Sequence, residues 1–186
     1  MTEPPNERPD ARRLEGSAYV DDDGSADAAL ATALREYDEG SAPYPAVIAA
    51  LTPARLIVPV IALLGETGEG AVGADGTALV TDKSSDMAAV LLTGADGRLA
   101  LLAFTDLEAL ASWDPQARPV PVAAHLAAAT AVQEGAAAVV VDVAGPHAFA
   151  LADDDLHRVA SGWTTVQLED GGWGWLGTAS NDHVAD

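Results

Sequence analysis

The sequence contains no cysteine. That absence excludes thiol nucleophiles, disulfides, thiolate metal sites and iron–sulfur clusters. Aromatic residues make up only 5% of the chain, although 49% of it is hydrophobic. Because alanine supplies much of that hydrophobic share, we expect a closely packed core of Val, Leu, Ile and Ala with few large side chains.

Basic residues are also scarce. Nine Lys and Arg stand against 29 Asp and Glu, which gives a formal net charge of -20, and Lys83 is the only lysine. Without a basic stripe to neutralise phosphates, we expect neither a nucleic-acid partner nor a membrane partner. An acidic surface suits basic partners or cations instead.

Long apolar runs are missing too. The longest, "ALTPARLIVPVIALLG" (50–65), is interrupted by Arg55 and two prolines and is too short to span a bilayer. The first sixteen residues lack the apolar region of a secretory signal. We therefore expect a cytoplasmic protein with a single folded domain.

The first half of the chain predicts a tail, two helices and a strand. Residues 1–24 are rich in Pro and charge and predict a disordered tail. The apolar spacing in 25–40 and 45–51 predicts two helices, and the β-branched run in 55–64 predicts a buried strand. Pro59 within that strand indicates an edge position or a bulge. A Gly-rich loop is expected over 65–86.

Two hairpin–helix units are expected next, over about 88–112 and 138–160. In the first, Asp96-Gly97 is a strong turn signal, and Thr105 with Glu108 matches a capping box at the start of a helix. Between the units, "RPVPV" predicts a loop before an alanine-rich helix near 121–133. Asp153–Asp155 place negative charge where a helix N-terminus favours it.

These elements predict the α+β class. We expect a largely antiparallel sheet of about five strands, built from the two hairpin–helix units, with helices packed on it. A final hairpin is expected about Gly171-Gly172. The folded domain then spans residues 25–176, and residues 177–186 form a frayed tail.

Two glycine-rich or polar stretches resemble functional motifs. "GEGAVG" (68–73) matches the dinucleotide-binding pattern G-x-G-x-x-G. That site needs a helix that begins at the motif, with its N-terminus facing the pyrophosphate, and no helical pattern follows here, which favours a chance match. Lys83, Ser84, Ser85 and Asp86 contain the residue types of a Ser–Lys pair. Flanking aspartates keep Lys83 charged, so we expect either a polar turn or a ligand contact and assign no catalytic residue.

The four histidines show no metal-ligand spacing, so we expect no metal site and no cofactor. Trp173 and Trp175 belong to a C-terminal tryptophan cluster with Trp163. Such a cluster either binds a partner or covers an open edge of the core, since both uses exploit a large apolar side chain.

Three stretches together resemble the SseB N-terminal-domain family: "LIVPVIALL", "TDKSSDMAAVLLTGADGRLALLAFTDLEALASWDP" and "VVVDVAGPHAFALADDDLHRVASG". The resemblance covers roughly residues 26–162, and "DKSSDM" before the hairpin is its most specific piece. The family's label comes from a genetic phenotype, enhanced serine sensitivity. The resemblance implies a small α+β domain of bacterial cytoplasmic proteins and carries no substrate, cofactor or catalytic residue to this chain.

We therefore expect a non-catalytic binding or adaptor module with a protein partner, contacted through Lys83–Asp86 or through Trp173 and Trp175. The alternative is a small-molecule sensor or an enzyme with a pocket beneath the 65–86 loop. Pairing of edge strands into a homo-oligomer is a third option.

Overall fold

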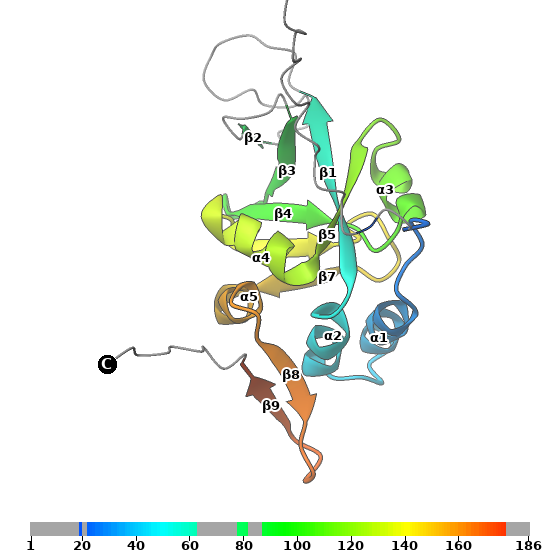
Figure 1. Ribbon diagram of the computed structural model, residues 1–186, viewed down its shortest axis with the longest axis vertical. Coiled ribbons are helices and arrows are strands. Elements are labelled where there is room, and N and C mark those ends of the chain that lie inside the picture. Colours follow the sequence, from blue (N-terminus) through cyan, green and yellow to red (C-terminus); the bar gives the residue numbers. More distant parts are fainter. Residues whose placement is uncertain (1–18, 20–21, 63–77, 82–86, 178–186) are drawn as a thin grey trace, which may run out of the picture.

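Figure 1 shows the computed structural model of the chain, which describes residue 19 and residues 22–62, 78–81 and 87–177. Within these residues, the elements in chain order are α1 (Ala28–Asp38), α2 (Tyr44–Leu51), β1 (Arg55–Ala62), β2 (Ala78–Thr81), β3 (Met87–Thr93), β4 (Leu99–Ala103), α3 (Leu107–Trp113), β5 (Arg118–Ala123), α4 (Ala124–Gln133), β6 (Ala138–Val141), β7 (Phe149–Ala152), α5 (Asp153–Ala160), β8 (Thr164–Gln167) and β9 (Trp173–Leu176). None of the described helices is long and apolar enough to cross a membrane.

The α+β class is confirmed, but the expectation of about five strands built from two hairpin–helix units is not exact. The main sheet has seven strands, in the order β5-β1-β3-β4-β6-β7 with β2 paired to β3 off this path, and β8 and β9 form a separate sheet. The main sheet is mixed because β4 and β6 run parallel, with Leu101 opposite Val139. The units β3–β4–α3 and β6–β7–α5 are present, yet they leave out β1, β2, β5 and the separate sheet.

Prolines occupy β1 and β5 without interrupting the ladder between these strands. Ile57 lies opposite Pro121, and Pro59 lies opposite Pro119. The N–H and C=O of Ile57 bond to Phe104, on the side away from β5. Because backbone groups alternate in direction along an antiparallel strand, all three proline nitrogens also point away from this ladder. In the strand order, β1 lies between β5 and β3, so Pro59 is in an inner strand rather than an edge strand. The predicted loop "RPVPV" belongs to the edge strand β5.

Side chains around the end of β4 pack alternately into two hydrophobic clusters. Leu101 and Ala103 lie in the larger cluster, with buried residues of α1, α2, α4 and α5. Leu102 and Phe104 lie in the smaller cluster with Leu110 of α3. Phe104 is the largest fully buried side chain described, and most of the core is Leu, Val, Ile and Ala, as the composition predicts.

The expected C-terminal hairpin is present as β8 and β9, and it extends from the lower end of the molecule in Figure 1. The Thr165 hydroxyl donates to the Pro45 carbonyl at 2.5 Å, and the hydroxyls of Thr164 and Thr52 lie 2.5 Å apart. Gly171 takes a left-handed conformation in the turn, with φ of 82°. The two threonine contacts bind the hairpin to α2 through its first strand, β8.

Candidate binding site

A cleft of about 300 Å³ opens where the parallel strands β4 and β6 end. Chain segments that follow neighbouring parallel strands leave the sheet at the same edge, and a crevice between them is a common ligand site. The cleft is lined by α1 and the segment before it, by the β4–α3 connection with α3, and by the β6–β7 loop. Those lining residues are Ala26, Ala31, Leu34, Thr105, Asp106, Glu108, Ala109, Ser112, Asp142, Ala144, Gly145, Pro146 and His147.

Asp142 directly follows β6 and forms a buried part of the cleft wall, with 8% of the residue exposed. One carboxylate oxygen accepts the Thr105 N–H at 2.9 Å, and the other accepts the Thr105 hydroxyl at 2.8 Å. Thr105 is itself 5% exposed. These two hydrogen bonds join the segments that leave the ends of β4 and β6.

The backbone at Asp142 is left-handed, with φ of 52°. Asp and Asn tolerate this conformation better than other residues with a side chain. The Asp142 carbonyl accepts the Gly145 N–H at 2.8 Å, which closes a tight turn. A Cβ at position 145 would lie 3.2 Å from both the Cβ and the carbonyl oxygen of Asp142, so this close approach favours glycine.

Asp106, rather than the predicted Thr105, is the N-cap of α3. Its carboxylate accepts the Ala109 N–H at 2.7 Å. Because the Thr105 hydroxyl bonds to Asp142, the following residue takes the capping position. Glu108 lies in the first turn of α3 and contributes to the lining of the cleft.

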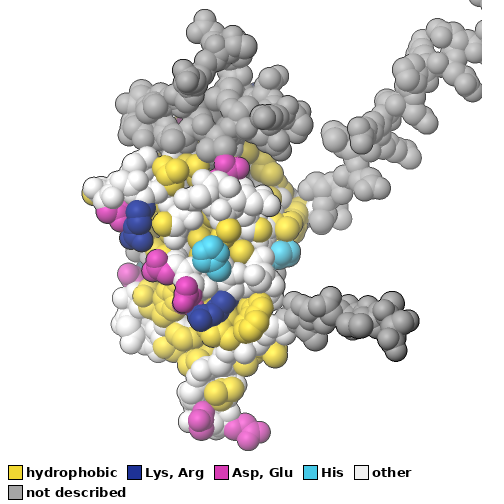
Figure 2. Space-filling model, turned by 90° about the vertical axis from the view of Figure 1, so that its left-hand side faces the viewer, with side chains coloured by type: hydrophobic (Ala, Val, Ile, Leu, Met, Phe, Trp, Pro, Cys, Tyr) yellow, Lys and Arg dark blue, Asp and Glu magenta, His cyan; other side chains and the backbone are white. Residues whose placement is uncertain are grey.

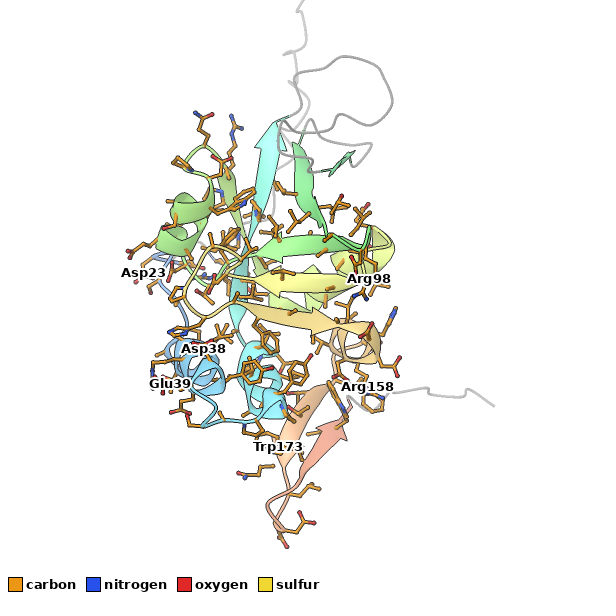
Figure 3. The ribbon with its side chains drawn as sticks, turned by 180° about the vertical axis from the view of Figure 1, so that it is seen from behind. Asp23, Asp38, Glu39, Arg98, Arg158 and Trp173 are labelled. Atoms are coloured by element: carbon orange, nitrogen blue, oxygen red, sulfur yellow. The ribbon has the colours of Figure 1, made fainter. Side chains whose placement is uncertain are left out.

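The cleft is strongly acidic. Asp106, Glu108 and Asp142 line it, and its lining contains no Lys or Arg. Burial, and more weakly the negative charge of Asp106, raise the pKa of Asp142 above the ordinary value of 3.8, although the hydrogen bonds from Thr105 act in the opposite direction. In Figure 3, Asp23, Asp38 and Glu39 lie on the side of the molecule that holds α1 and α3, whereas Arg98 and Arg158 lie on the opposite side.

Arg55 connects the cleft to the segment before α1. Its guanidinium contacts both carboxylate oxygens of Asp22, at 2.6 and 2.8 Å, and the two side chains are 12% and 14% exposed. It also donates to the carbonyls of Ser25 at 2.6 Å and of Thr105 at 2.8 Å. Such a two-point contact fixes geometry as well as charge. Asp22 falls within the predicted tail 1–24, and of that tail the structure describes only residues 19 and 22–24.

His147 connects the β6–β7 loop to α1. Its Nδ1 lies 3.1 Å from a carboxylate oxygen of Asp38, the last residue of that helix. This contact holds one wall of the cleft against another. The ring nitrogen that faces Asp38 is therefore already engaged within the chain.

Two residue types used in covalent catalysis, a serine and a histidine, occur in the lining of the cleft. A serine nucleophile needs a base within hydrogen-bonding reach. Ser112 and His147 both line the cleft, but no hydrogen bond joins them within the described residues, and His147 pairs with Asp38. The described part of the chain also places no group of three or more His, Asp or Glu side chains to hold a metal ion.

The site residues expected from the sequence are placed unequally. Lys83, Ser84, Ser85 and Asp86 lie outside the described residues, as does most of the expected 65–86 loop. Trp173 and Trp175 are half-buried in β9. Trp175 packs against the larger hydrophobic cluster, with the Arg158 guanidinium carbon 5.2 Å from the centre of its ring.

Sequence reasoning missed Asp142, Thr105 and Asp106 as neighbours in one site. One signal was present, because "VVVDVAGPH" places a carboxylate directly after a buried strand and before a Gly-Pro loop. Its significance depends on the parallel partner β4, and a hairpin pattern does not predict that pairing.

Comparison with known proteins identifies the family of the chain. Residues 27–158 match the family model described as SseB protein N-terminal domain. No curated protein and no solved structure matched the chain. The family match covers well over half of the sequence and includes the elements that form the cleft, from α1 to the β6–β7 loop. The chain therefore belongs to the SseB family, through that family's N-terminal domain.

Proposed function

We propose that this SseB-family protein is a non-catalytic binding module and that the cleft lined by Thr105 and Asp142 holds its ligand. One observation carries the proposal: the Asp142 carboxylate is buried on the wall of a cleft of about 300 Å³ and held there by a left-handed backbone. Buried ionisable groups and uncommon backbone conformations concentrate at functional sites. The volume lies at the lower end of the range that small ligands occupy.

The cleft replaces the pocket that the sequence suggested beneath residues 65–86. That segment lies mainly outside the described residues, whereas every residue lining the cleft is described. The proposal retains the cytoplasmic location expected from the sequence.

An NMR titration of the full chain tests the proposal. The ¹⁵N-labelled protein is titrated with a mixed set of small cationic, neutral and anionic fragments. We expect resonance changes concentrated in residues 105–112 and 142–147. Ala31→Trp should abolish them by filling the cleft, because Ala31 lines it. Ala29→Trp is the matched control, since Ala29 is also exposed on α1 but does not line the cleft.

Two results would count against this function. One is that no fragment perturbs the cleft residues at any accessible concentration. The other is that Ala31→Trp binds the fragments as well as Ala29→Trp does.

A second candidate function is an adaptor that binds a protein through the hairpin. Trp163, Leu168 and Leu176, here called the hairpin surface, are 40%, 46% and 57% exposed. Figure 2 shows hydrophobic side chains on this part of the molecule and acidic side chains at its lower end, where the turn of the hairpin lies. Since the turn carries Glu169 and Asp170 and the chain has a net charge of -20, the partner proposed is basic.

This candidate is tested by capturing a basic partner from the native host and measuring its affinity by calorimetry. The double variant Leu168→Ser with Leu176→Ser should weaken binding about tenfold or more. Leu126→Ser is the matched control, because Leu126 is 53% exposed on α4, away from the hairpin. Equal affinity of the double variant and the control would remove the hairpin surface from the proposal.

A further inference from the structure

We infer that the cleft binds a positively charged organic group, an ammonium or a guanidinium, with the Asp142 carboxylate as its counter-charge. The inference rests on the proposed function, because it assigns a ligand class to the same cleft. It is argued from the burial of Asp142, from the cations of the chain itself and from the shape of the lining.

The first step concerns the charge of Asp142. A buried carboxylate is costly unless it is paired with a cation or fully hydrogen-bonded. The two described hydrogen bonds to Asp142 come from the neutral groups of Thr105. A carboxylate offers about four acceptor positions, so acceptor capacity remains. Asp106 and Glu108 add negative charge to the same lining.

The second step concerns the cations near the cleft. Arg55 directs its guanidinium to Asp22 and to the carbonyls of Ser25 and Thr105. His147 directs its Nδ1 to Asp38. The described cationic side chains in this region are therefore engaged elsewhere, and Asp142 has no ion pair within the described residues. A cation from outside the chain would complete the pair.

The third step concerns the kind of cation. In the described part of the chain, no set of three or more His, Asp or Glu side chains is placed to hold a metal ion. The lining instead combines the acidic groups with apolar surface from Ala31, Leu34 and Ala109. A charged head on an alkyl stem matches both parts, since the stem contacts the apolar wall and the head donates hydrogen bonds to the carboxylate.

The distribution of charge over the molecule supports the same ligand class. Asp23, Asp38 and Glu39 lie on the side of the molecule that holds α1 and α3 (Figure 3). With a net charge of -20, the protein attracts a cation and repels an anion at long range. The electrostatic field of the protein therefore favours the approach of a cationic group, the class that Asp142 would bind.

The experiment compares three probes of similar size: butylammonium, 1-pentanol and pentanoate. Each is titrated into the ¹⁵N-labelled full chain. We expect butylammonium to perturb residues 105–112 and 142–147 with an affinity about tenfold or more above that of 1-pentanol, and pentanoate to be weaker still. A fourth probe, a capped tripeptide with a central lysine, tests whether the ammonium group comes from a protein side chain or from a free amine. Tighter binding of butylammonium or of the tripeptide than of 1-pentanol supports the inference.

Asp142→Asn is the decisive variant. Asn tolerates the left-handed backbone, and the Thr105 hydroxyl can turn to accept from its amide, so the fold is retained. We expect butylammonium binding to weaken about tenfold or more. Asp154→Asn is the matched control, because it removes the same charge from an exposed site on α5.

The outcomes separate this inference from the proposed function. If 1-pentanol or pentanoate perturbs the cleft and butylammonium does not, the inference falls and the binding function stands. If no probe perturbs the cleft, both fall. If Asp142→Asn binds butylammonium as tightly as Asp154→Asn does, Asp142 is not the counter-charge and the inference is overturned.

Discussion

Asp142 and Thr105 show how two ordinary residues acquire a particular role through their neighbours. In the sequence, Thr105 has the spacing of a helix cap and Asp142 is one of many acidic residues. In the structure, the Thr105 hydroxyl and N–H both bond to Asp142, and Asp106 caps α3 instead. A side chain that could cap a helix is thus used to hold a buried charge.

At this scale, we predict that Asp142→Asn stabilises the ligand-free protein at neutral pH. Burial raises the pKa of Asp142, so the folded protein binds a proton more readily than the unfolded chain does. Stability therefore falls as pH rises from below 3.8 through the raised pKa, and the loss is complete above it. Removing the charge should recover on the order of 1 kcal/mol at pH 7.

Urea unfolding of both proteins across the pH range measures this difference. The two stabilities should converge below 3.8, where the Asp142 carboxyl is protonated in both states of the wild type. Asp106, Glu108, His147 and Asp38 are present in both proteins, so the difference between the two curves reports the change made at Asp142. A less stable Asp142→Asn at pH 7 would show that the charge itself supports the fold.

At the scale of elements, the pairing of β4 with β6 decides where the cleft forms. Each strand belongs to its own hairpin, and the parallel contact brings the two hairpins into one sheet. The segments that follow both strands then leave the sheet at the same edge, which is why Thr105 and Asp142 meet. The hairpin β8–β9 belongs to a separate sheet and is held on α2 by side-chain hydrogen bonds.

We predict that Trp175 fixes this hairpin to the body of the protein and that Trp163 does not. Trp175 packs on the larger hydrophobic cluster and lies beside Arg158, whereas Trp163 is 40% exposed. Trp175→Ala should lower the free energy of unfolding by about 2 kcal/mol, and Trp163→Ser by less than about 0.5 kcal/mol. Urea unfolding followed by circular dichroism measures both, and equal losses would contradict the assignment.

At the scale of the whole molecule, charge is the dominant feature. The chain carries 29 acidic and nine basic residues, so charges of one sign repel one another over the folded surface. Among the ion pairs of the described residues, only that of Arg55 with Asp22 is well buried on both sides. Repulsion among exposed carboxylates therefore outweighs attraction at long range.

We predict that salt stabilises this protein. Raising NaCl from about 0.01 M to about 1 M shortens the screening length from about 30 Å to about 3 Å and weakens long-range repulsion. The free energy of unfolding at neutral pH should rise by roughly 1 kcal/mol, as measured by urea unfolding at each salt concentration. A fall in stability would mean that local ion pairs contribute more than the net charge does.

The α+β class, the helices around Leu30 and Ile48, the hairpin turn at Asp96-Gly97 and the final hairpin could all be predicted from the amino-acid sequence. Each depends on periodicity or turn chemistry within a short segment. The remaining features depend on contacts between distant segments. β5 is a strand despite Pro119 and Pro121 because the register of β1 turns their nitrogens outward. Asp142 becomes a candidate ligand contact because β6 pairs with β4. Pairing and register join residues far apart in the chain, and no local pattern records which segments will meet.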